Sequence, residues 1–182
     1  MLSSRIPSVK DTYFQHKVLT KVHGKPTYES LQTLATEIKA NAGSVPSTAG
    51  GGANGHLGMI LSAARYATLQ ATVPWIQPVN PGAFVPPVPP GTAAQIEAAR
   101  DVWRDANQAF ALSQATEKAL IAQIVESIDP IYIRALLNRT TGQFSTSIRA
   151  VMTHLFTTHG KITPQQVTAK QQTVYAMHYD IT

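Results

Sequence analysis

The feature of this sequence that most limits the possible folds is a proline-rich stretch near its middle. "VPWIQPVNPGAFVPPVPPGT" (73–92) holds seven of the chain's twelve prolines. Proline lacks a backbone N–H and has a fixed φ, so this stretch can neither join a sheet nor run as a helix. We expect an extended strap, with Trp75, Ile76 and Phe84 docking parts of it against the core.

Helical periodicity dominates the chain on both sides of this stretch. Apolar residues recur at spacings of three and four, and no strand of convincing length is present. The predicted helices cover 28–40, 63–70 with Ser62 as N-cap, 93–128 as two helices or one bent helix, 130–138 with Asp129 as cap, 148–159 ending at Gly160, and 165–177. The sequence therefore predicts an all-α bundle of about five to seven helices.

Composition divides the chain into three segments. Residues 1–25 hold five basic side chains against one acidic one, while 26–91 and 92–182 are close to balanced. We expect 1–25 to be a basic, partly disordered arm, 26–91 an N-terminal helical part and 92–182 a helical bundle. The candidate nucleic-acid contacts are Arg5, Lys10, Lys17, Lys21 and Lys25, because each neutralised phosphate adds salt-dependent affinity. The alternative is a merely solubilising tail.

Large apolar residues mark the expected core of the C-terminal segment. One stripe places Trp103 in helical register with Phe110, and a second, displaced around 112–116, contains Leu120 and Ile124. Leu155 lies on the apolar face of the helix over 148–159. We predict that Trp103, Phe110, Leu120, Ile124 and Leu155 organise the core.

A glycine-rich stretch, "TAGGGANGHLGMIL", raises the question of a phosphate-binding loop. Gly50, Gly52 and Gly55 match G-x-G-x-x-G, yet a helix precedes them and the lysine of a P-loop is missing. We expect a flexible loop, mobile over 49–54, followed by a buried anchor over 59–61. Close backbone packing is the alternative.

The remaining side chains do not form a familiar catalytic or metal-binding pattern. The chain has no cysteine, and the expected surface histidines His154 and His159, five residues apart, point in different directions on a helix. Glu97, Asp101 and Asp105 alternate with Arg100 and Arg104, which is typical of a salt-bridged exposed helix face. We expect no enzymatic activity, cofactor, metal or small-molecule substrate. Without a signal peptide or a membrane-spanning stretch, the chain is expected to be cytoplasmic.

The C-terminal half resembles a known family. Trp103, the stretch "EKALIAQIVESIDPIYIRALLNRTTGQFSTSIRAVMTHLFTTHGKIT", and the upstream pieces "HGKPTYESLQTLATEIKANAGSVPSTAGGG", "GHLGMILS" and "PVNPG" are similar to the Gag capsid region of copia-type LTR retrotransposons, of the divergent type found in algae and other protists. Two features differ. Val151 or Met152 replaces a common tryptophan, and the Cys-Cys-His-Cys zinc knuckle is absent.

This resemblance implies a structural protein without catalytic activity. Gag capsids are helical bundles that assemble as hexamers and pentamers into a shell, an intracellular virus-like particle, around the element's RNA. The expected partners are therefore further copies of the chain, and RNA. Two alternatives stay open: a nucleic-acid-binding module acting through 1–25, and a domesticated Gag-derived helical adaptor.

Overall fold

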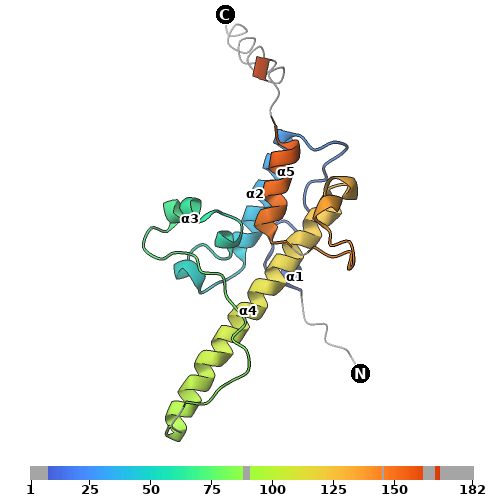
Figure 1. Cartoon of the computed structure of the whole chain (residues 1–182). Helices are drawn as coiled ribbons and strands as arrows, with labels where there is room; N and C mark the ends of the chain where they lie inside the picture. The colour runs from blue at the N-terminus through green and yellow to red at the C-terminus, as the bar shows by residue number, and fades with distance from the viewer. Residues whose placement is uncertain (1–7, 88–90, 145, 162–166, 169–182) are drawn as a thin grey trace, which may run out of the picture.

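The computed structural model describes residues 8–87, 91–144, 146–161 and 167–168 (Figure 1). In this part of the chain the regular structure is helical, apart from isolated backbone bridges at Val22 with Ile128 and Leu137 with Phe144. Its α-helices over the described residues are α1 (Val9–Tyr13), α2 (Tyr28–Ser44), α3 (Ala63–Leu69), α4 (Ala93–Ser127) and α5 (Ile148–His159). Short 3₁₀ helices lie at Ala49–Gly51, Leu57–Met59, Pro130–Tyr132 and Arg134–Leu136. The predicted all-α class is confirmed for these residues.

Local sequence features account for the two ends of α2 and for the buried face of α5. Thr27 caps α2, because its side chain accepts a hydrogen bond from the Ser30 backbone while the Ser30 side chain bonds back to Thr27. The helix continues four residues past the predicted end at Ala40 and stops before Val45, which precedes Pro46 and is therefore extended. The predicted apolar face of α5 is confirmed, because its buried residues are Ile148, Val151, Met152 and Leu155.

The core lies where α2, α5 and the C-terminal half of α4 meet, with α2 and α5 side by side (Figure 1). Leu120, Ile124 and Leu155 are fully buried in it, as predicted. The N-terminal segment also enters the core, with Phe14, Leu19 and Val22 among the buried residues. The core thus draws on all three segments that composition separates.

Helix α4 is a single continuous helix rather than two, and only part of it reaches the core. Its buried residues begin at Ser113. Trp103 and Phe110 are half-buried and lie outside the core, so the prediction that they organise it is wrong. Trp103 faces the proline-rich strap instead, where its ring meets that of Phe84.

The N-terminal segment is not an arm over the described residues 8–25, which corrects the prediction. Ser8 caps α1, and the chain then crosses the bundle with Phe14, Leu19 and Val22 at most 8% exposed. The Val22 backbone N–H donates to the Ser127 carbonyl (2.8 Å). Burying these apolar side chains explains why the segment packs despite its charge.

The chain after α4 differs from the predicted helix over 130–138. The Asp129 carboxylate accepts from the Ile131 backbone N–H (3.0 Å), but only the two short 3₁₀ helices follow. The chain then turns over 138–142, and Leu137 pairs with Phe144. Except for Val167 and Thr168, the predicted helix over 165–177 lies outside the described residues.

Candidate functional site

The most prominent candidate site is the N-terminal half of α4 with the strap beside it. Residues 93–111 extend away from α2 and α5, and the strap runs back along them (Figure 1). We call residues 93–111 with strap residues 73–87 the projecting arm. At 1.5 Å per residue, the helical part is about 28 Å long.

Two aromatic contacts hold the strap in place. Trp103 Nε1 donates to the Gly82 carbonyl (2.9 Å), and the Phe84 ring meets the Trp103 ring edge-on at 6.1 Å between centroids. The guanidinium of Arg100 lies over the Phe84 ring at 5.4 Å, a cation–π contact. At the other end, Trp75 packs against Tyr66 (5.9 Å) and His56 (5.8 Å). Trp75 therefore docks against the core as predicted, whereas Phe84 docks on the projecting half of α4, outside the core.

The strap also exposes apolar side chains. Ile76 is 73% exposed, so the prediction that it docks is wrong. Val79 and Val85 are exposed to a similar degree, and Val102 is 70% exposed on the helix itself. Exposed apolar residues gathered on one projecting element are typical of an interaction surface.

The charged face of the arm is an ion-pair network, as predicted. Glu97 pairs with Arg104 (2.8 Å) and Arg100 (3.4 Å), and Asp101 pairs with Arg104 (2.8 Å). Among the described residues Asp105 makes no ion pair. Positions 97, 100, 101 and 104 share one face of the helix. This face therefore carries both signs of charge over its whole length.

The lysines predicted to contact nucleic acid do not act as one group. Lys10 forms an ion pair with Glu126 (3.1 Å), and Lys17 Nζ donates to the backbone carbonyls of residues 10 and 11 (2.7 and 2.5 Å). Lys21 and Lys25 are exposed and make no ion pair with any described residue, while Arg5 lies outside the described residues. Of the predicted set, Lys21 and Lys25 are left open to a polyanion.

A buried polar centre that the sequence reading missed ties the N-terminal segment to the bundle. Asn41 Oδ1 accepts from the His16 backbone N–H (2.7 Å), and Asn41 Nδ2 donates to the His16 carbonyl (2.9 Å) and to Gln123 Oε1 (2.9 Å). Gln123 Nε2 donates to the carbonyls of His16 (2.8 Å) and Lys17 (3.2 Å). Asn41 and Gln123 continue the apolar stripes of α2 and α4, and a polar residue on a buried stripe could have indicated the centre.

The glycine-rich loop is packed against the protein rather than open, so the alternative interpretation holds. Gly50 is buried with φ +60°, and the Tyr66 hydroxyl donates to its carbonyl (2.9 Å). A Cβ at Gly55 (φ +51°) would overlap the Gly43 carbonyl. These glycines allow close backbone approach, a steric role that does not involve phosphate. Of the expected anchor over 59–61, Met59 and Ile60 are buried, while Leu61 is half-buried.

One histidine is buried, and the predicted divergence of His154 and His159 is wrong. His56 is buried, its Nδ1 lies 3.1 Å from the Val45 carbonyl, and burial lowers its pKa. The rings of His154 and His159 meet edge-on at 6.4 Å rather than diverging, and Tyr132 also contacts His159 (5.2 Å). Within the described ranges, no group of three or more histidine, aspartate or glutamate residues is placed to hold a metal ion.

Comparisons with protein-family models, curated proteins and solved structures find no match to this chain. None of the helices that the structure describes has both the length and the apolar character needed to span a bilayer. The projecting arm is where the described residues depart from a closed bundle (Figure 1).

Proposed function

We propose that the protein is a structural subunit of the Gag capsid type, which assembles with further copies of itself into a cytoplasmic shell around RNA. The projecting arm carries this proposal. A helix that extends about 28 Å beyond its own core exposes surface that contributes little to folding. Such a surface gains most of its stabilisation when a partner covers it.

The charges on the arm favour a second copy as this partner. In an antiparallel pair of arms related by a two-fold axis between Arg100 and Asp101, Glu97 of each copy faces Arg104 of the other. In the same register Arg100 faces Asp101 of the other copy. A two-fold contact needs a self-complementary surface of this kind. Such pairs contribute more to register and specificity than to affinity.

The size of the arm indicates a weak pairwise contact. A helix about 28 Å long and about 10 Å across has a lateral surface of about 900 Å². If half of this faces a partner, each copy buries about 450 Å², well below the roughly 800 Å² per partner of a standard interface. A shell held by many weak contacts fits this value better than a permanent dimer does.

A charge-swap experiment tests the proposal. The first variant combines Glu97→Arg with Asp101→Arg, the second combines Arg100→Glu with Arg104→Glu, and the third, off-arm control combines Lys21→Glu with Lys25→Glu. Light scattering and negative-stain electron microscopy of RNA-free protein measure assembly, and circular dichroism checks that each variant folds.

We expect the first two variants to lose assembly when alone and to regain it when mixed, because the mixture restores opposite charges across the contact. The control should assemble like the wild type. Wild-type protein that stays monomeric at all concentrations would refute self-assembly. A first and a second variant that assemble normally when alone would refute the arm as the contact.

A further inference from the structure

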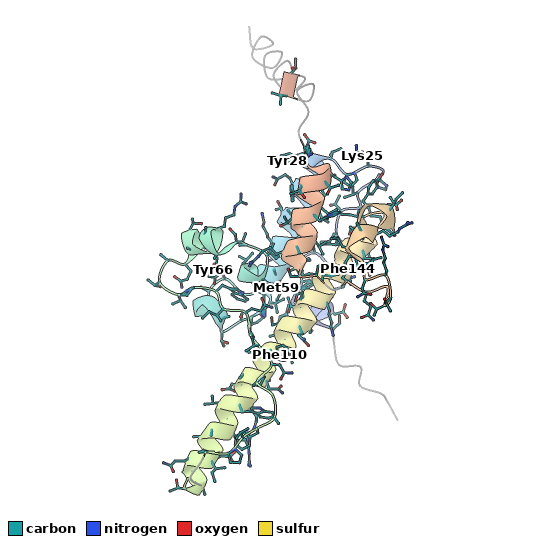
Figure 2. The ribbon with its side chains drawn as sticks, viewed as in Figure 1. Lys25, Tyr28, Met59, Tyr66, Phe110 and Phe144 are labelled. Carbon is teal, nitrogen blue, oxygen red and sulfur yellow. The ribbon has the colours of Figure 1, made fainter. Side chains whose placement is uncertain are left out.

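A groove between α2 and α5 has the composition of an anion site. It encloses about 470 Å³ and is closed at one end by the chain leading into α3. Tyr28, at the start of α2, contacts Phe156, near the end of α5, so the two helices run antiparallel. Lys39 late in α2 and Arg149 early in α5 consequently lie at the opposite end of the groove from Tyr28, whose position Figure 2 shows.

The charged side chains of the groove are all cationic, without a balancing carboxylate. Lys39, Arg65 and Arg149 all line the groove, and none of its thirteen lining residues is acidic. None of the three forms an ion pair with any described residue. Glu117, which shares a neighbouring hollow with Arg149, accepts from the Ile148 backbone N–H (3.0 Å). Three like charges that line one groove repel one another, and a bound anion relieves this repulsion.

Arg149 combines a fixed position with spare hydrogen-bonding capacity. One of its terminal nitrogens, Nη2, donates to the Gly58 carbonyl (2.6 Å). A guanidinium has five N–H donors, so four are left for a ligand. Arginine held in place in this way suits phosphate, whose oxygens accept a pair of parallel hydrogen bonds.

The other end of the groove is aromatic. The Tyr28 and Phe156 rings meet edge-on, with centroids 6.2 Å apart, above an apolar floor that includes Met152. Aromatic side chains beside a cationic track are the arrangement with which proteins bind single-stranded nucleic acid. From Tyr28 to Lys39, eleven residues along α2, the groove is about 16 Å long, which is longer than a single nucleotide.

We propose that this groove binds a short single-stranded RNA segment, with phosphates at Lys39, Arg65 and Arg149 and a base against Tyr28 and Phe156. This inference rests on the proposed capsid function in one respect only: the bound strand would be part of the packaged RNA. It places the main RNA contact on the bundle rather than in the N-terminal segment.

Fluorescence anisotropy with a labelled eight-nucleotide uridine strand tests the groove, at protein concentrations where light scattering detects no assembly. The groove variant combines Lys39→Ala with Arg65→Ala and keeps Arg149, whose bond to Gly58 supports the fold. Lys118→Ala with Lys161→Ala removes the same charge from exposed lysines elsewhere.

We expect the groove variant to bind at least about ten-fold more weakly, with a log–log salt slope shallower by about 1.4, because two phosphate contacts are lost. The control should keep the wild-type slope. Equal losses in both variants would show that only net charge matters and would overturn the proposal. A loss confined to Lys21→Ala with Lys25→Ala would overturn it in favour of the N-terminal lysines.

Two further measurements identify the ligand. Uridine monophosphate should bind much more weakly than the strand, and equal affinity would overturn the strand assignment in favour of a nucleotide site. Tyr28→Leu should weaken strand binding at least about five-fold but leave an abasic strand unaffected, since only base stacking is removed. The groove variant keeps its arm and should still assemble, so failure of RNA binding is distinguishable from failure of the proposed shell.

Discussion

Replacing Gln123 with methionine tests whether the N-terminal segment belongs to the fold. Methionine has a similar length and shape but cannot accept from Asn41 Nδ2 or donate to the carbonyls of His16 and Lys17. The matched control is Gln114→Met, at an exposed position on the same helix.

The expected cost follows from the groups left without partners. His16 keeps its bond from Asn41, but one hydrogen of the buried Asn41 amide and the Lys17 carbonyl lose theirs. A buried group left unsatisfied costs about 1–3 kcal/mol, so we expect a loss of about 3 kcal/mol in the free energy of unfolding. For a chain of this size that lowers Tm by about 6–12 °C.

Urea unfolding followed by circular dichroism measures the loss, and limited trypsin digestion locates it. Because the lost bonds hold the N-terminal segment, cleavage after Lys17 and Lys21 should accelerate in Gln123→Met before the rest of the chain is cut. If Gln123→Met and Gln114→Met differ by less than about 0.5 kcal/mol, the polar centre does not hold the segment.

Three other perturbations probe the remaining features. Gly55→Ala should lower the free energy of unfolding by more than about 2 kcal/mol, against about 1 kcal/mol for Gly24→Ala. Both glycines have positive φ, but only Gly55 lies against neighbouring backbone. Urea titration measures both variants, and equal losses would contradict the packed loop. Burial lowers the pKa of His56 in the folded protein below 6.5, the ordinary histidine value. As the pH drops, the unfolded chain is therefore protonated at this residue before the folded protein is. The free energy of unfolding should fall between pH 6.5 and the folded pKa. Urea titrations across this range should show a smaller fall in His56→Gln, and equal pH dependence would exclude His56 as the cause. Phe84→Ala should shift tryptophan emission to longer wavelength by exposing Trp103, yet change the free energy of unfolding by less than about 1 kcal/mol; a larger loss would mean that the strap supports the core.

Local patterns in the sequence predicted α2, α3, α4 and α5, but they missed α1 and wrongly extended a helix over 130–138. The starts of α2 and α5 follow from caps at Thr27 and Ser147, and their buried faces follow from apolar spacing, both of which act within a few residues. The extended strap likewise follows from proline geometry alone. Such features do not depend on distant parts of the chain, so they are readable without a structure.

The sequence did not show which distant segments of the chain pack against one another. The apolar stripe around Trp103 is the same whether it meets the core or the strap, and only the tertiary structure shows that Phe84 covers it. The N-terminal charges indicated a free arm, while the sparse apolar residues Phe14, Leu19 and Val22 bury themselves against the bundle. The anion groove joins Lys39, Arg65 and Arg149 from three separate elements, which no local spacing connects.

The sequence alone determined an all-α fold with a proline strap, because helix periodicity, caps and the missing proline N–H are local properties of the chain. The tertiary structure decided which stripe reaches the core, whether the glycine loop is open or packed, and which cations share a groove. These outcomes depend on contacts between residues that can lie more than a hundred positions apart, such as His16 with Gln123, and contacts of that kind leave no periodic signal in the sequence.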